Sequence, residues 1–99
     1  MLCVDWKKMS KNLKKKSNID QRTLQSAYEL MCTARHMAIL YDENREVCSK
    51  YVHSTSRGHE AIQLAAGLQL KEFDYASLYY RDESVLLGMG MQPYELMLQ

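Results

Sequence analysis

Apolar residues recur at intervals of three and four through the middle of this 99-residue chain, the spacing that gathers side chains on one face of an α-helix. The residues that share this face are Leu24, Ala27, Tyr28, Met31, Ala34, Ala38 and Tyr41. We therefore predict a long helix that turns this stripe toward the core. Its start falls near residues 17–20, where Ser17, Asn18 and Asp20 are candidate capping residues and Gln21 lies at capping-box distance from Asn18. No Gly or Pro interrupts the chain before Cys48, so the helix can run on toward that residue.

A second helix is predicted after Gly58. The preceding residues 49–58 carry few aliphatic and many hydroxyl side chains, so they form an exposed loop or lead directly into this helix. A stripe with a period near four follows, and the helix ends within residues 71–74. The residues of the stripe are Ile62, Ala65, Ala66 and Gln69. The small residues from Ala65 to Gly67 would allow another backbone to approach closely.

The last quarter of the chain predicts short elements separated by turns. Residues 75–80 are an aromatic stretch that favours a short strand or an extended segment. Asp82 is placed to cap a short helix that Gly88 and Gly90 then stop. The apolar residues of that helix are Val85, Leu86 and Met89. Pro93 suits the first turn of a final helix, whose apolar face is still continuing at the end of the sequence, so we expect the front part of something longer.

Basic residues are concentrated at the front of the chain. Residues 1–22 hold seven Lys or Arg against two acids, although the net charge of the chain is only +1. Lysines surround a helical face formed by Leu2, Trp6, Met9 and Leu13. Such a segment binds anionic membrane, nucleic acid or a partner protein, or else is a solvated extension whose apolar residues dock onto the domain. No aromatic or Arg residues interleave the lysines as on a base-stacking surface, so we favour the second interpretation. We divide the chain into a basic extension, 1–17, and a helical part, 18–99.

Composition favours helix and argues against several classes of protein. One Pro and four Gly leave long uninterrupted stretches. No apolar run is long enough to cross a bilayer and no secretory signal is visible, so we expect a cytoplasmic protein. Three cysteines without paired spacing argue against a disulfide framework or a zinc site. Cys32 and His36 share a helix face, but two ligands make no metal site, and we predict none.

Two predicted helix starts carry groups that favour anions. Tyr80 and Arg81 precede a capped helix, where a guanidinium fork, a phenol donor and free backbone amides suit phosphate or carboxylate oxygens. The same reasoning applies to His59, which follows Gly58. The alternative is a surface ion pair between Arg81 and the acidic residues that follow it. His59 and His53 are the residues suited to acid–base chemistry, but no catalytic triad can be argued from them, and we name no catalytic residue.

Three motifs in this half of the chain follow one another in a specific order. They read Arg-Gly-His-Glu-Ala-Ile-Gln from Arg57, Tyr-Tyr-Arg-Asp from Tyr79, and Gly-x-Gly-x-x-Pro-x-Glu-Leu from Gly88. This order resembles the front of the alpha subunit of the thiamine-diphosphate-dependent 2-oxo acid dehydrogenases, the decarboxylating E1 component of the pyruvate and branched-chain complexes. The likeness covers residues 20–99 and is most specific from Arg57 onward, whereas residues 1–17 have no counterpart.

The resemblance implies that this mainly α fragment is the N-terminal helical part of an α/β thiamine-diphosphate-binding fold. It also implies that Tyr80 and Arg81 bind the diphosphate of the cofactor and that Tyr79 lines the site. Mg²⁺ would neutralise the phosphate charge that these donors leave. Many members of the family have His where this chain has Glu83, so no role of that histidine is transferred.

The loop before the second helix is implied to face the substrate. Gly58, His59 and Glu60 match a structural motif that orients this loop, and Val52 and His53 would lie in the substrate channel. Aromatic residues common in the loop are replaced near Val52, which leaves the size of the substrate open. A branched-chain 2-oxo acid of the 2-oxoisovalerate type is our first expectation, and pyruvate or acetoin comes next.

One motif of the family is missing from these 99 residues, the Gly-Asp-Gly to Asn sequence that binds metal and diphosphate. We therefore expect the chain alone to be inactive and to hold no cofactor. In the complete enzyme, thiamine diphosphate would lie between this subunit and a beta subunit or fused beta domain, and the acyl group would pass to the lipoyl domain of E2. We expect a homo-oligomer that binds neither nucleic acid nor membrane. The alternative is a small basic helical module that binds one of those two.

Overall fold

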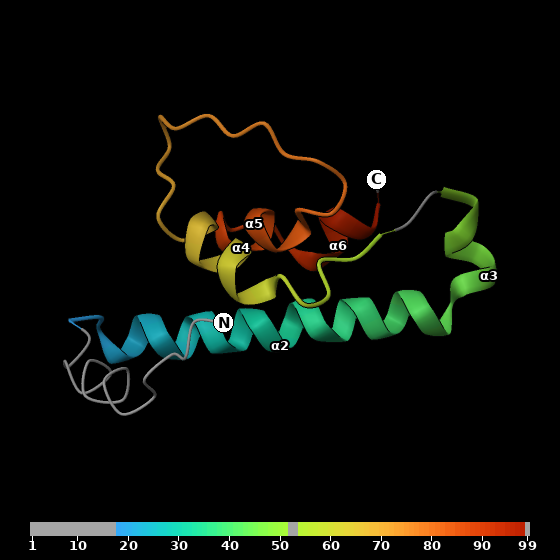
Figure 1. The fold of residues 1–99 in the computed structure, drawn as a ribbon, viewed down its shortest axis with the longest axis horizontal. Coiled ribbons are helices and arrows are strands. Elements are labelled where there is room, and N and C mark those ends of the chain that lie inside the picture. The colour runs from blue at the N-terminus through green and yellow to red at the C-terminus, as the bar shows by residue number, and fades with distance from the viewer. Residues whose placement is uncertain (1–17, 52–53, 99) are drawn as a thin grey trace, which may run out of the picture.

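The computed structural model describes residues 18–51 and 54–98 (Figure 1). This part of the chain is mainly helical and contains no strand, which confirms the predicted helical character. The helices are α2 (Gln21–Glu43), α3 (Arg45–Cys48), the 3₁₀ helix η1 (Ser49–Tyr51), α4 (Glu60–Gly67), α5 (Glu83–Gly88) and α6 (Pro93–Met97). The predicted basic extension, 1–17, lies outside the described residues. None of these helices is long and apolar enough to cross a membrane.

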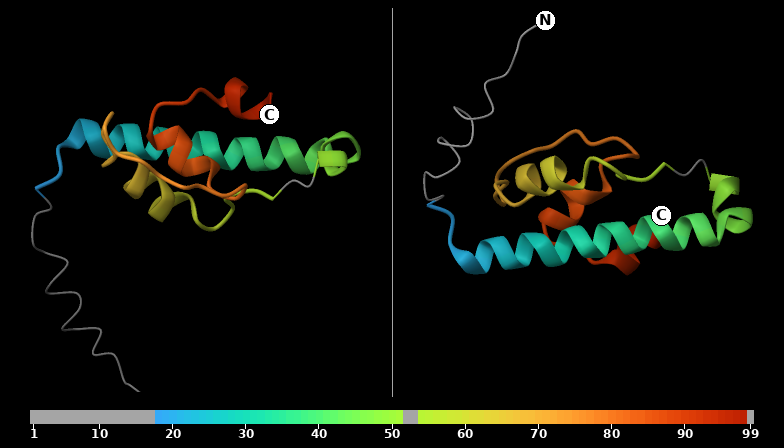
Figure 2. Two further views of the ribbon diagram at one scale, coloured as in Figure 1. Left: turned by 90° about the horizontal axis from the view of Figure 1, so that it is seen from above. Right: turned by 60° about the horizontal axis from the view of Figure 1, so that its bottom comes forward.

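The long helix α2 supports the shorter ones. Figure 1 shows α4 and α5 along one side of α2 and α3 at its far end, and Figure 2 shows α5 between α4 and α6. The core forms where these short helices meet the second half of α2. Its buried apolar residues are Ala34, Met37, Ala38 and Tyr41 of α2, Leu64 of α4, Val85 and Leu87 of α5, and Leu96 of α6.

The start of α2 agrees with the prediction, and one of the three candidate capping residues is its N-cap. Asp20 is the N-cap residue, and its carbonyl accepts a hydrogen bond from the Leu24 N–H at 3.1 Å. Its side chain forms no capping hydrogen bond. Gln21 is the first helical residue, so it cannot occupy the third position that a capping box requires, and the predicted box with Asn18 is wrong.

The helix does not continue to Cys48, because Asn44 ends it. The Asn44 backbone N–H and side-chain amide both donate to the Leu40 carbonyl, at 3.0 and 2.8 Å. Asn side chains compete with the backbone for such carbonyls and favour helix ends. The separate short helix α3 begins with the next residue, Arg45.

The predicted stripe of α2 is buried only in its second half. Ala34, Ala38 and Tyr41 belong to the core, together with Met37, which the periodicity did not include. The earlier members of the stripe are exposed, namely Leu24, Tyr28 and Met31. The buried partners from α4, α5 and α6 gather around residues 34–41, and Leu30 packs against the same cluster, whereas Leu24, Tyr28 and Met31 are exposed.

A close backbone contact joins α4 to α5, as the run of small residues predicted. A Cβ atom on Gly67 would lie 2.3 Å from the Val85 carbonyl oxygen and 3.0 Å from the Gly88 Cα. Only a residue without a side chain fits there. Ala65 and Ala66, which were expected to share this role, are exposed instead.

The face that α4 turns inward also differs from the predicted stripe. Leu64 is buried, whereas Ile62 is exposed. The helix is shorter than expected, because it ends at Gly67 and leaves residues 68–82 as a long connection. Residues 75–80 form no strand and are mostly exposed. The predicted starts of α5 after Asp82 and of α6 at Pro93 are confirmed.

Candidate functional site

Tyr80 and Arg81 stand at the tip of a turn that precedes α5. The Asp82 N–H donates to the Tyr79 carbonyl at 2.9 Å, and the Tyr79 N–H donates to the Asp82 carboxylate at 2.9 Å. Asp side chains commonly close turns in this way. The carboxylate therefore fixes the backbone of the turn. Asp82 is the N-cap residue of α5, as predicted, but its side chain forms no capping hydrogen bond.

Gln63 of α4 holds the same turn from the outside. Its side-chain amide donates to the Arg81 carbonyl at 3.1 Å and to the second carboxylate oxygen of Asp82 at 3.2 Å. Gln63 is the last residue of the motif that begins at Arg57, so one of the quoted motifs positions another. Sequence reasoning did not assign a role to this residue, although its place in the motif was a signal.

The side chains of the turn form an exposed aromatic and cationic surface. The rings of Tyr79 and Tyr80 lie 4.2 Å apart between centroids and are tilted by 51°. The Arg81 guanidinium carbon lies 5.8 Å from the centroid of the Tyr80 ring, which is cation–π distance. Within residues 18–51 and 54–98, Arg81 forms no ion pair, so the surface pair considered as an alternative is not found. Its donors are available to an anion.

Gly58 and Glu60 shape the start of α4. Gly58 has a φ of 86°, a conformation that suits glycine, and its N–H donates to the Glu60 carboxylate at 2.7 Å. The His59 N–H donates to the Ser56 carbonyl at 2.8 Å and completes the turn. The His59 side chain is exposed beside this turn.

A buried pair of serines brings the starts of α4 and α5 together. The hydroxyl oxygens of Ser56 and Ser84 are 2.6 Å apart, and both residues are buried. Ser56 precedes the Gly58 turn, and Ser84 lies in the first turn of α5. The two helix starts that the sequence singled out are therefore joined by a direct hydrogen bond. Neither serine was predicted to be buried, and the hydroxyl-rich segment that contains Ser56 is typical of an exposed loop.

The end of α2 supports the starts of both helices. The Tyr41 phenol interacts with the carboxylate of Glu83, the first residue of α5. Burial is the largest cause, and the neighbouring Glu83 carboxylate the next, of a pKa of Tyr41 that is raised above its ordinary value. Arg57, one residue before Gly58, pairs with Asp42 at 2.9 Å. This second contact is half-exposed and contributes little, about 0–1 kcal/mol.

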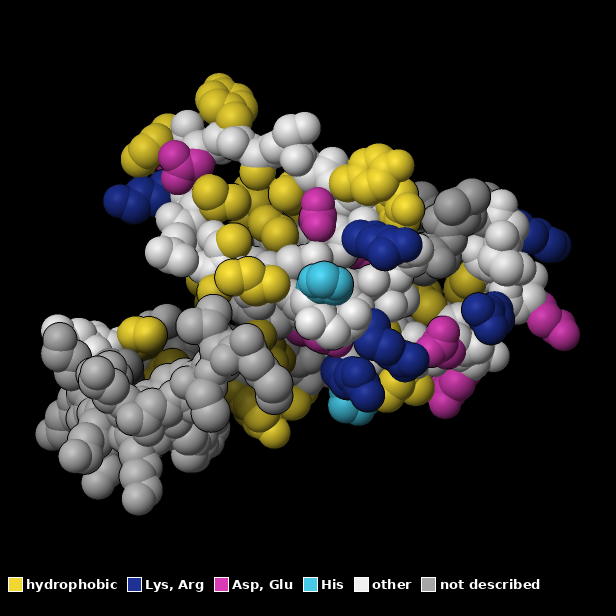
Figure 3. Space-filling model, in the orientation of Figure 1, with side chains coloured by type: hydrophobic (Ala, Val, Ile, Leu, Met, Phe, Trp, Pro, Cys, Tyr) yellow, Lys and Arg dark blue, Asp and Glu magenta, His cyan; other side chains and the backbone are white. Residues whose placement is uncertain are grey.

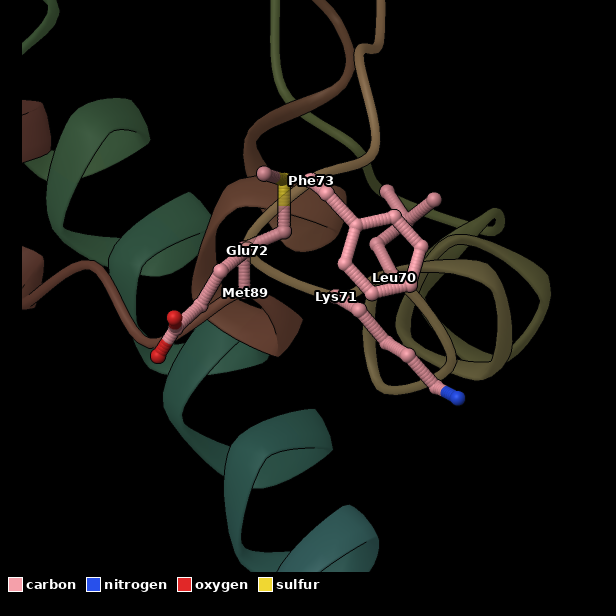
Figure 4. A pocket seen from close by; sticks show the side chains of 5 residues that line it. All are labelled: Leu70, Lys71, Glu72, Phe73 and Met89. Atoms are coloured by element: carbon pink, nitrogen blue, oxygen red, sulfur yellow. The ribbon is translucent and has the colours of Figure 1, made fainter.

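A hollow of about 480 Å³ opens at the C-terminal ends of α4 and α5, away from the turn at Arg81. Its lining residues are Leu70, Lys71, Glu72, Phe73 and Met89. Figure 4 shows the charged ends of Lys71 and Glu72 pointing in different directions, so they do not converge on one ligand position. The Lys71 ammonium instead lies 5.9 Å from the centroid of the Phe73 ring.

Cys32 and His36 lie one turn apart on α2 and are joined through the backbone. His36 Nδ1 donates to the Cys32 backbone carbonyl at 2.8 Å. In the part of the chain that the structure describes, no three His, Cys, Asp or Glu residues are grouped to hold a metal ion.

The predicted site residues thus fall into two neighbouring groups, the turn of Tyr79, Tyr80 and Arg81 and the turn from Gly58 to Glu60. Figure 3 shows hydrophobic and basic side chains next to one another over α4, α5 and the connection between them. Val52 and His53, expected in the substrate channel, lie outside the described residues. Comparison with protein-family models, curated proteins and solved structures finds no match for this chain.

Proposed function

We propose that this chain is the N-terminal helical part of an E1 alpha-type subunit of a thiamine-diphosphate-dependent 2-oxo acid dehydrogenase. In this proposal Tyr80 and Arg81 bind the diphosphate, and Tyr79 lines the site. The turn at residues 79–82 is the observation that supports this proposal. The Asp82 carboxylate accepts a hydrogen bond from the Tyr79 N–H, and Gln63 donates to Arg81 and Asp82, so the backbone of the turn is held in place. The Arg81 guanidinium makes no ion pair among the described residues.

The chemistry of the turn suits a diphosphate. A guanidinium donates two parallel hydrogen bonds to phosphate oxygens, and a phenol donates a third. Because the backbone of the turn is already fixed, less conformational entropy is lost when an anion is bound. The Ser56–Ser84 hydrogen bond keeps the Gly58–Glu60 turn next to this site. That arrangement supports a structural role for Gly58, His59 and Glu60.

The remaining parts of such an enzyme would come from outside this chain. Bound thiamine diphosphate supplies a nucleophilic carbon that decarboxylates a 2-oxo acid, first of all a branched-chain one. The described residues offer Arg and Tyr donors for the diphosphate but no group of metal ligands, so Mg²⁺ would need ligands from elsewhere. We accordingly propose that further residues complete an α/β cofactor-binding fold. The partners in this proposal are a beta subunit or fused beta domain and the lipoyl domain of E2, which accepts the acyl group. The assembly would be a homo-oligomer in the cytoplasm.

The coding DNA beyond Gln99 gives the first test. A continuation that contains Gly-Asp-Gly and a downstream Asn supports the proposal, because those residues would complete the metal and diphosphate site. A stop codon directly after Gln99 would refute it for this gene product.

Titration of the complete subunit with thiamine diphosphate and Mg²⁺ gives the second test. We expect Arg81→Ala to weaken binding about ten- to a hundredfold, since hydrogen bonds to charged groups contribute about 1.5–3 kcal/mol. Arg45→Ala is the matched control, because Arg45 is also an exposed arginine but lies on α3, beyond the far end of α2. Equal affinities of the two variants would defeat the role of Arg81.

A further inference from the structure

The first half of α2 presents an exposed apolar face in the part of the chain that the structure describes. Leu24, Tyr28 and Met31 are 48%, 67% and 36% exposed, and their spacing of four and three places them on one side of the helix. Exposed apolar residues aligned on one side of a helix are suited to a contact with another apolar surface. It leads into a groove of about 320 Å³ lined by Tyr28, Met31, Cys32, Arg35, His36 and Glu60.

We propose that the basic extension, residues 1–17, covers this face as an antiparallel partner of α2. The extension immediately precedes the helix in sequence and carries its own apolar face. The residues of that face are Leu2, Trp6, Met9 and Leu13. The lysines fall mainly on the opposite side, where their charges stay in water.

The spacing of the two faces matches when one is reversed. From Leu13 back to Met9 and Trp6 the intervals are four and three, the same as from Leu24 to Tyr28 and Met31. The connection, residues 14–20, then has seven residues, within the about two to eight that commonly join neighbouring helices. A tethered partner has an effective concentration of about a millimolar. At protein concentrations below about a millimolar, binding of the extension to this face is therefore favoured over binding of a second copy of the chain.

The groove suits an indole at the position where this register puts Trp6, opposite Met31. An indole has a broad apolar body and one N–H donor, which needs an acceptor when it is buried. Tyr28 and Met31 supply apolar walls. Glu60 lines the same groove, and its Oε1 atom is buried without a hydrogen-bond partner among the described residues.

Fluorescence of Trp6 tests the proposal directly, because it is the one tryptophan in the sequence. In the 99-residue chain we expect emission at a shorter wavelength, and weaker quenching by iodide, than in a synthetic peptide of residues 1–17. Sedimentation over a range of concentrations accompanies the measurement. The shorter wavelength should persist on dilution to a monomer.

Two leucines on α2 provide matched variants. Leu24→Ser removes an apolar group from the proposed contact and should move the emission toward that of the peptide. Leu40→Ser makes the same change at a residue that is 47% exposed on the same helix, about 24 Å away along its axis, and should leave the emission unchanged. Circular dichroism checks that both variants keep their helix content. Leu13→Ser, in the extension itself, should act like Leu24→Ser without touching the described core.

Three results would overturn the proposal. The first is emission from the chain identical to that of the peptide. The second is a shorter wavelength that disappears on dilution together with a dimer, which would assign the face to a second copy. The third is an equal effect of Leu24→Ser and Leu40→Ser, which would mean that the extension does not use this face.

Discussion

Substitution of Gly67 by alanine tests how closely α4 and α5 must approach. The added Cβ would lie 2.3 Å from the Val85 carbonyl oxygen, whereas ordinary contacts begin at 3.4 Å. The nearest atoms all belong to the backbone, so no side-chain rotation can relieve the clash. The two helices would have to separate by about 1 Å, and the packing of the core around Leu64 would loosen with them.

The expected loss of stability follows from two opposing effects. Overpacking of this kind costs about 1–3 kcal/mol. Alanine is a better helix former than glycine by at most about 1 kcal/mol, a gain that is smaller at the last residue of a helix. We expect the folded state to lose about 2 kcal/mol, which corresponds to a fall in Tm of roughly 8–16 °C for a domain of this size.

Urea and thermal unfolding followed by circular dichroism would measure this loss. Ala66→Gly is the companion variant, because Ala66 is exposed on the same helix and reports the helix-propensity difference without a clash. We expect Ala66→Gly to lose no more than about 1 kcal/mol. A Gly67→Ala protein as stable as the wild type would show that α4 and α5 do not pack as described.

Two further predictions concern buried polar groups. Ser56→Ala leaves the buried Ser84 hydroxyl without its partner, so we expect the free energy of unfolding to fall by about 1–3 kcal/mol in urea titration. Tyr41 has a pKa raised above its ordinary value of about 10. As the pH rises above about 10, the unfolded chain therefore loses a proton that the folded chain keeps, and stability should fall with pH in unfolding experiments.

Each of these two predictions has its own control. The double variant Ser56→Ala/Ser84→Ala should lose less than the sum of the two single variants, because both partners are then gone. Additive losses would mean that the two hydroxyls do not interact. Tyr41→Phe should lack the decline in stability that the phenol causes at high pH. An identical decline in both proteins would assign it to other groups.

The sequence predicts which helices form more accurately than it predicts which side of each helix is buried. Asp82, Pro93 and the Gly58 turn are local signals, because the conformational preference of a single residue favours each of them. Burial depends on where other helices lie. Periodicity therefore could not show that Tyr28 would be exposed while Met37, on a neighbouring side of the same helix, would lie in the core.

The candidate site shows the same division. The groups that favour anions, Tyr80 and Arg81, stand out by residue type alone. The residues that hold them do not, because Gln63 and Ser84 act through contacts between segments far apart in the sequence. Hydrogen bonds of this kind leave no periodic or compositional trace. These contacts are visible only in the three-dimensional structure.

The long connection from α4 to α5 has both of its ends fixed by a carboxylate. The Lys71 N–H donates to Asp74 at 2.8 Å at one end, and the turn of Tyr79 and Asp82 closes the other. Residues 75–78 lie between them, are exposed except for the half-buried Leu78, and take part in neither of these hydrogen-bonded turns. Because lengthening a loop costs little, about 0.6 kcal/mol for each doubling, insertions there would leave the position of Arg81 unchanged. Evolution can thus vary the length and composition of this segment independently of the geometry at the start of α5.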